Sequence, residues 1–283
     1  MTVERSAVPG PAPAATPLHG RSHPVGPLRV VVLANSDGLQ VASRNLRPDE
    51  GPYPMLLADL LAVEGAPAEV RNCSRVMGMV EDGVRDFERV AWNFWPHLVV
   101  LHYGVQESYP GFFRPALHRR AWGIARSDRP IDRRLNGALQ ARWSLVQKAS
   151  NRLDRPWIPG QMPLRRFHAQ YDRLVRLCLG WTPAVVVAVG MHPPNFRMMK
   201  LAGAYPERRA RMQAVIEETV AKSPRCGLVD FQRVLDAVSP DFEKVMPDGL
   251  HLVPEGHRAL ARLIADEYWA IAARLAESAE AAR

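Results

Sequence analysis

Three residues in two short segments have the side-chain types that nucleophilic acyl transfer requires. Ser36 offers a hydroxyl, and Asp248 and His251 stand three positions apart much later in the chain. A serine hydroxyl becomes a nucleophile when an imidazole takes its proton and a carboxylate keeps that imidazole in the required tautomer. The three residues are therefore candidates for a Ser-His-Asp triad. Taken one at a time, residues 35–38 and 248–249 are also typical of plain turns.

Two further segments could supply contacts to a substrate. Residues 104–107 read Gly-Val-Gln-Glu, in which Gln106 carries an amide donor suited to an oxyanion and Glu107 carries a carboxylate. His192 follows an apolar run and is either a substrate contact or a structural residue.

The elements that must position these residues alternate along the chain. Short β-branched runs predict five strands, and amphipathic stretches between them predict helices. The expected strands cover residues 29–33, 68–72, 97–102, 184–189 and 227–230, and the expected helices cover residues 55–63, 80–94, 164–179, 206–221 and 254–278. This order predicts a three-layer α/β/α, doubly wound domain with a flavodoxin-like five-stranded parallel sheet. In such sheets ligands bind beyond the carboxyl ends of the strands, where the polar segments fall.

Length and composition restrict the class of protein. The 283 residues are 47% hydrophobic and 23% charged, which fits one large domain, expected over residues 28–283. Residues 1–27 are rich in proline and glycine and lack the apolar stretch of a secretory signal, so they predict a disordered arm on a cytoplasmic protein. No apolar run approaches the ~20 residues of a membrane span. The three cysteines and the glycines show no spacing that predicts a metal site or a cofactor.

An arginine-rich stretch at residues 108–165 interrupts the alternation of strands and helices. A strand-to-helix connection is normally ~2–6 residues long, so this insertion predicts a helical lid or binding element. Residues 111–180 hold 15 lysines and arginines against four acidic residues, a net +11 in a chain of +8. This charge favours an acidic or carrier-linked acyl substrate, or a partner protein. A solvated arginine-rich cap is the alternative, and the lack of a nucleic-acid-binding motif argues against nucleic acid.

The first and last of these motifs resemble those of the SGNH/GDSL hydrolase family, and the resemblance extends over residues 28–275. The family pattern begins with Gly-Asp-Ser after the first strand, where this chain has Ala34-Asn35-Ser36. It ends with an Asp and a His three apart before the last helix, matched by residues 248–257.

The two middle blocks of the family pattern match less closely. The third block, Gly-x-Asn-Asp, aligns with residues 104–107 and places Gln106 where the family has its oxyanion asparagine. The second block, an Asn followed by an oxyanion glycine, fits Asn72 and Gly78 when one extra residue is allowed.

The resemblance implies a metal-independent serine esterase or acyltransferase that acts on an ester or thioester. Ser36 would be the nucleophile and His251 the general base and then acid, with Asp248 orienting the imidazole. The N–H groups of Ser36 and Gly78 and the amide of Gln106 would bind the oxyanion. The expected substrate contacts are Asn35, Gly104, Glu107 and His192.

Two alternatives stay open at this point. Hydrolysis and acyl transfer share the same residues and differ only in whether water reaches the acyl-enzyme. A catalytically reduced protein of the same fold, which binds a metabolite or a partner through residues 108–165, is the competing interpretation.

Overall fold

The computed structural model describes residues 26–39, 46–47, 50–109, 160–193 and 203–282. The predicted arm at residues 1–27 lies almost wholly outside the described residues, and so does most of the predicted insertion at residues 108–165.

Five parallel strands form one sheet in the order β2-β1-β3-β4-β5. The strands are β1 (Leu28–Ala34), β2 (Ala68–Asn72), β3 (Leu98–His102), β4 (Val185–Val189) and β5 (Cys226–Val229). The chain crosses from β2, on one side of β1, to β3 on the other. In sheets of this order the crevice at that reversal, beyond the carboxyl ends of β1 and β3, is the usual place for a ligand.

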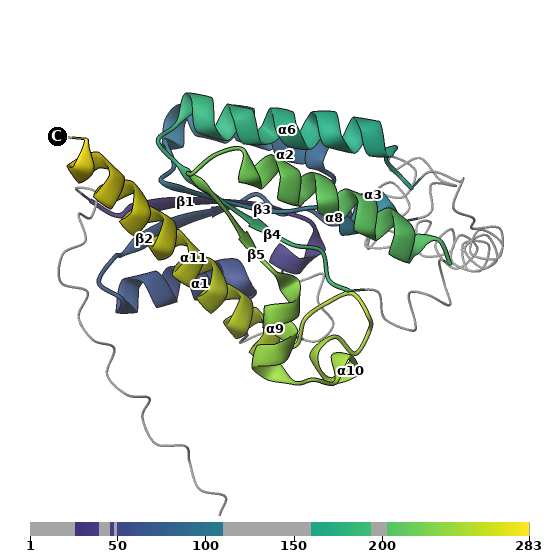
Figure 1. Ribbon diagram of the computed structural model, residues 1–283. Helices are drawn as coiled ribbons and strands as arrows, with labels where there is room; N and C mark the ends of the chain where they lie inside the picture. The colour runs from purple at the N-terminus through teal and green to yellow at the C-terminus, as the bar shows by residue number, and fades with distance from the viewer. Residues whose placement is uncertain (1–25, 40–45, 48–49, 110–159, 194–202, 283) are drawn as a thin grey trace, which may run out of the picture.

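Helices cover both faces of the sheet, as Figure 1 shows. One layer contains α2 (Val80–Phe94), α6 (Leu164–Trp181) and α8 (Tyr205–Ala221), and the other contains α1 (Tyr53–Val63), α9 (Phe231–Val238) and α11 (Pro254–Ala281). Three short elements, η1 (Ser36–Gly38), α3 (Val105–Ser108) and α10 (Phe242–Val245), complete the described structure. The expected three-layer, doubly wound α/β/α architecture is therefore confirmed.

Alternation along the strands divides the core into two halves. Val30 and Val32 of β1 pack with α1 and α11, whereas Val31 and Leu33 pack with α2 and α6. Successive side chains of a strand point to opposite faces, so a strand covered by helices on both sides is apolar throughout. This explains why β1, β3 and β4 are nearly continuous hydrophobic runs in the sequence.

The five predicted strands and five predicted helices all occur, with ends within a few residues of those expected. Three short helices, α3, α9 and α10, were not predicted. A helix of eight residues such as α9 is too short to be stable alone. It is held by the Asp230 carboxylate, which accepts a hydrogen bond from the Gln232 N–H at 3.0 Å, and by the burial of Phe231, Val234 and Leu235.

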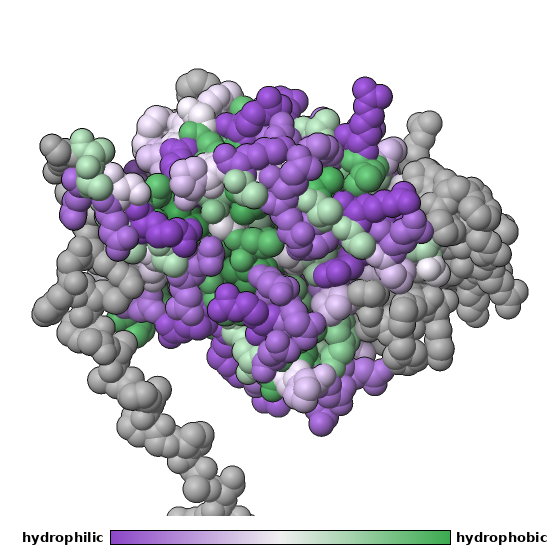
Figure 2. Space-filling view, viewed as in Figure 1, coloured by the Kyte–Doolittle hydropathy of each residue, from purple (hydrophilic) through white to green (hydrophobic). Residues whose placement is uncertain are grey.

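The outer surface of the described part is mainly polar. On the face shown in Figure 2 hydrophilic residues predominate, and hydrophobic residues are visible mainly between the two helical layers. Among the described residues, no helix combines the length and the apolar character that crossing a membrane requires.

Candidate active site

Ser36 lies directly beyond β1, in the tight turn of η1. Asn35 caps this turn, because its Oδ1 accepts a hydrogen bond from the N–H of Asp37 at 3.1 Å. The N–H of Asn35 in turn donates to the carbonyl of His102, at the end of β3, at 3.3 Å. Asn35 is buried and its side chain serves the backbone, so it positions Ser36 rather than contacting a substrate as expected.

The structure brings Ser36, His251 and Asp248 into one hydrogen-bonded line. Ser36 Oγ lies 3.1 Å from His251 Nε2, and His251 Nδ1 lies 2.7 Å from Asp248 Oδ2. The serine and the histidine are 215 positions apart in the chain. This is the arrangement in which an imidazole can remove the hydroxyl proton while a carboxylate holds its other nitrogen.

Asp248 is ionised and firmly oriented. Partial burial raises the pKa of this carboxyl group, but hydrogen bonds from the His251 ring and from the N–H groups of His251 and Leu250 outweigh that effect and lower the pKa to about 2. Its Oδ1 accepts the two backbone bonds, at 2.8 and 2.9 Å, and its Oδ2 accepts the imidazole. A carboxylate held in this way stays negative throughout the pH range in which histidine titrates.

The loop that carries Asp248 and His251 is closed by its own backbone. Gly249 has a φ of 78°, in the left-handed region that favours glycine, and its N–H donates to the carbonyl of Met246 at 2.8 Å. Val253 closes the loop through a hydrogen bond from its N–H to the carbonyl of Val245 at 2.9 Å, and α11 begins at the next residue. The acid and the base therefore reach the sheet edge on a short, fixed segment.

The segment after β2 runs alongside the end of β1. The N–H of Arg75 donates to the carbonyl of Ala34 at 3.0 Å, and a Cβ on Gly78 would lie 3.1 Å from the same carbonyl oxygen. The N–H of Gly78, however, donates to the carbonyl of Arg75 at 2.9 Å and closes a turn. Because this N–H is occupied, the expected role of Gly78 as an oxyanion donor is not supported.

Met77 occupies the position that the family pattern gives to glycine when no extra residue is allowed. Its φ is 54°, a left-handed conformation that is uncommon for a residue with a side chain. Its N–H has no hydrogen-bond partner within the described part of the chain. Sequence reasoning missed Met77 because the glycine next to it was the more obvious match.

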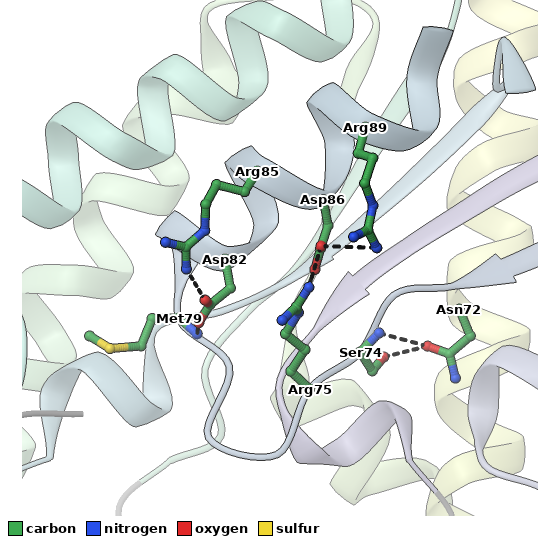
Figure 3. A network of polar contacts seen from close by, with 8 residues as sticks. All are labelled: Asn72, Ser74, Arg75, Met79, Asp82, Arg85, Asp86 and Arg89. Carbon is green, nitrogen blue, oxygen red and sulfur yellow. Dashed lines mark hydrogen bonds and ion pairs between the residues drawn. The ribbon is translucent and has the colours of Figure 1, made fainter. Parts of the chain in front are cut away.

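Figure 3 shows the polar network that holds this segment. Arg75 donates from Nε to Asp86 Oδ2 of α2 at 2.6 Å and makes a second bond to the other oxygen of that carboxylate. The N–H of Met79 donates to Asp82 Oδ2 at 3.1 Å, and Arg85 and Arg89 flank the two acids. A two-pronged arginine–carboxylate contact fixes direction as well as distance. The segment that contains Met77 is thus anchored to α2.

A second anchor joins the same segment to η1. Asn72, the last residue of β2, donates from Nδ2 to the carbonyl of Gly38 at 2.6 Å, while its Oδ1 accepts from the N–H and the hydroxyl of Ser74 at 3.1 and 2.5 Å. A Cβ on Gly38 would come within 1.9 Å of Ser74 Oγ. Glycine at position 38 is therefore needed for this close approach.

Glu107 connects the segment after β3 to the start of α2. Its side chain is fully buried, and its two oxygens accept the N–H groups of Val80 at 2.7 Å and Gly104 at 2.8 Å. Burial raises the pKa of this carboxyl group to about 7 in spite of those hydrogen bonds. The Glu107 carboxylate and the Gly104 N–H, both expected to contact the substrate, are bonded to each other in this structure.

Gln106 and His192 lie in different surroundings. Gln106 is partly exposed in α3, beside the same sheet edge. His192 is fully buried. Its ring stacks on that of Tyr205 with the centroids 6.3 Å apart, and meets that of Phe231 edge-on with the centroids 5.8 Å apart. Burial lowers its pKa to about 4, so the ring is neutral. The structure gives His192 a packing position below the site and no exposed edge for a substrate.

Known proteins share this architecture. No family model and no curated protein sequence matches the chain. Among solved structures, TesA is 16% identical over 86% of this chain and 99% of its own, with a TM-score of 0.54. A lipase/acylhydrolase from Enterococcus faecalis is 15% identical over 87% of this chain and 96% of its own, with a TM-score of 0.55. A GDSL-like lipase from Bacteroides thetaiotaomicron is 14% identical over 86% of this chain and 87% of its own, with a TM-score of 0.50.

These similarities show that the chain has the fold of the SGNH/GDSL hydrolases, as the sequence motifs predicted. The identities are low, so the comparisons establish the architecture, and the chemistry has to be argued from the side chains of this protein.

Substitutions at Glu107 and Gln106 distinguish a residue that stabilises the fold from a neighbour that does not. We expect Glu107→Ala to lower the free energy of unfolding by about 2–5 kcal/mol, because two buried backbone N–H groups lose their acceptor and a cavity is left. Gln106→Ala, on a partly exposed neighbour, should change stability by less than about 0.5 kcal/mol. Urea unfolding of both variants checks this. Equal losses of stability would contradict the assignment of Glu107 as the buried connector.

Proposed function

We propose that the protein is a serine hydrolase of the esterase type, which cleaves an ester or thioester through Ser36, His251 and Asp248. The observation that carries the proposal is the hydrogen-bonded line from Ser36 Oγ through the His251 ring to the Asp248 carboxylate. This line of hydrogen bonds lies beyond the carboxyl ends of the parallel strands, where ligands bind in folds of this kind. The SGNH/GDSL fold supports the same chemistry.

The proposed reaction has two stages. Ser36 Oγ attacks the carbonyl carbon while His251 Nε2 takes the hydroxyl proton, and a tetrahedral oxyanion forms. The C–O or C–S bond then breaks, and the leaving group receives that proton from His251. Water next attacks the acyl-enzyme while His251 takes its proton. The bond between the acyl carbon and Ser36 Oγ then breaks, His251 returns the proton to Oγ, and the acid leaves. Asp248 stays ionised throughout and stabilises each imidazolium.

Three donors are proposed for the oxyanion. They are the N–H of Ser36, the N–H of Met77 and the side-chain amide of Gln106. The Met77 N–H has no partner among the residues that the structure describes, and its backbone is left-handed; both observations support its inclusion in place of Gly78. Donors act when they lie ~2.7–3.1 Å from the developing charge, and the loss of one costs roughly 10²–10³ in turnover. Gln106→Ala is therefore expected to remain folded while its kcat falls by about this factor.

The substrate is proposed to be acidic or attached to an acidic carrier. The support is the net charge of +11 over residues 111–180, next in sequence to α3. An acyl acceptor other than water would turn the same site into an acyltransferase, and the acyl-enzyme would be identical. A partner protein bound through residues 108–165 is part of the same proposal.

Covalent labelling tests the nucleophile. We expect a fluorophosphonate probe to add once to the wild type and to Ser278→Ala, whose hydroxyl lies on the exposed surface of α11. Ser36→Ala should stay unlabelled, and His251→Ala should label much more slowly, because the hydroxyl loses its base. Intact mass spectrometry over time measures all four proteins. If the folded wild type is neither labelled nor able to turn over a small ester, the non-catalytic binding protein becomes the better explanation.

The pH profile tests the general base. Activity on a small ester should fall on the acid side as His251 is protonated, because only the neutral ring can accept the Ser36 proton. Asp248 has its pKa lowered to about 2, so its protonation cannot cause a loss near neutrality. We expect kcat/KM to rise with pH across the range in which histidine titrates and then to level off. A profile that stays flat from pH 5 to 8 would argue against this base.

A further inference from the structure

A group of titratable side chains lies buried beneath Ser36, and the proposed reaction uses none of them. Each is at most 3% exposed and has at least one polar atom without a hydrogen-bond partner in the described structure. The group consists of Asp37, Tyr53, His102, His192, Tyr205 and His257. Buried polar atoms are nearly always paired, so six side chains of this kind beneath one site call for a functional explanation.

Asp37 is the carboxylate of this group and the neighbour of the nucleophile. Its Cα is ~3.8 Å from that of Ser36, as in any trans peptide, and its N–H is held by Asn35 Oδ1 at 3.1 Å. Only 3% of Asp37 is exposed. Its Oδ2 lies 4.0 Å from His102 Nε2, and its Oδ1 has no hydrogen-bond partner among the described residues. The buried Oδ1 is therefore left without a direct donor.

The residues around Asp37 do not neutralise it. Burial lowers the pKa of His102 to about 3 and those of His192 and His257 to about 4, so these rings are uncharged near neutral pH. His102 lies within ion-pair distance of Asp37 but is uncharged, so the two side chains together carry only the negative charge of Asp37. Burial also raises the pKa of Tyr53 well above its ordinary value.

The charges of His251 and Asp248, on the loop before α11, act on the Asp37 carboxyl group. Burial raises the pKa of Asp37 to about 6, and the attraction of His251 limits that rise while the repulsion of Asp248 adds to it. Above pH 6 the side chain is mostly ionised. The groups surrounding it are then His102 at the end of β3, Tyr53 of α1, Tyr205 of α8, and Asp248 and His251 of the loop before α11.

We propose that Asp37 is a second carboxylate of the site, which acts through His251 and stabilises the imidazolium that forms when this ring takes the Ser36 proton. The inference rests on the proposed function. A buried charge acts more strongly on its neighbours than an exposed one, because little water screens it. Asp248 binds the far nitrogen of the ring, whereas Asp37 acts by its charge from beside the nucleophile. Asp37 is thus a positioning residue, which acts on the reaction through the effect of its charge on His251.

The sequence supports this division of roles. Where the SGNH/GDSL pattern has an acid directly before the serine, this chain has Asn35, and an acid follows the serine instead. Asn35 caps the turn through the Asp37 N–H, and Asp37 Oδ1 accepts no hydrogen bond in the described structure.

The test compares Asp37→Asn with Asp59→Asn. Both remove one negative charge without changing side-chain size, but Asp59 is exposed on α1. An NMR titration of the His251 ring should show its midpoint falling by roughly 0.5–1 pH unit in Asp37→Asn and staying unchanged in Asp59→Asn. The acid limb of kcat/KM should move to lower pH by the same amount, and kcat should fall about tenfold. Asp37→Ser, a shorter neutral variant, should repeat the shift.

Thermal stability distinguishes this role from a structural one. The pKa of Asp37 is higher in the folded protein than its ordinary value of 3.8, so the folded state loses stability from this group as the pH rises from about 4 to 6. At pH 8 the Tm of Asp37→Asn should therefore equal or exceed that of the wild type, while its kcat is lower. A residue needed only for packing would lower both.

The inference and the proposed function fail in different ways. If the His251 midpoint is the same in Asp37→Asn and the wild type, the charge coupling does not exist and the inference is overturned, whatever the activity. If the midpoint shifts but no turnover depends on Ser36, the coupling is supported and the hydrolase proposal fails.

Discussion

The hydrogen bond of 3.1 Å between Ser36 Oγ and His251 Nε2 depends on the geometry of the whole sheet. Ser36 follows the first strand and His251 precedes the last helix, so the two residues meet only if β1 and β5 are parallel members of one sheet with α11 packed across it. The apolar faces of these elements supply most of the stabilisation, since burial of apolar surface is the main driving force of folding. Packing of the core therefore sets the distance on which the proposed chemistry depends.

Buried carboxylates then hold the segments that surround the serine. Glu107 joins the start of α2 to the segment after β3, and Asp86 holds Arg75 in the segment after β2. Both accept two hydrogen bonds, which offset the cost of burying a carboxylate. Asp37 differs, because its buried Oδ1 accepts no hydrogen bond in the described structure. Glu107 and Asp86 thus serve backbone N–H groups and an arginine, whereas this oxygen of Asp37 serves neither.

Some residues expected to contact the substrate serve the backbone in this structure. Asn35, Gly104 and Glu107 drew attention because they follow β1 and β3, beyond whose ends ligands bind. The backbone N–H groups of the tight turns at that edge also need acceptors. The side chains of Asn35 and Glu107 provide them, and Gly104 contributes one of these N–H groups. The sequence does not show whether such a residue contacts a substrate or a backbone group. Met77 was missed because a left-handed backbone is a property of the turn and leaves no mark in the residue type.

The sequence by itself determined the architecture of this protein and the identity of the proposed triad. Alternating apolar runs specify strands and helices locally, and the spacing of Asp248 and His251 places an acid beside a base on one loop. Only the tertiary structure decided which N–H groups are occupied and which polar side chains are buried, as for Gly78, His192 and Asp37. Hydrogen bonding and desolvation depend on neighbours that are distant in the chain, so the surroundings of a side chain are set only when the sheet and its helices are assembled.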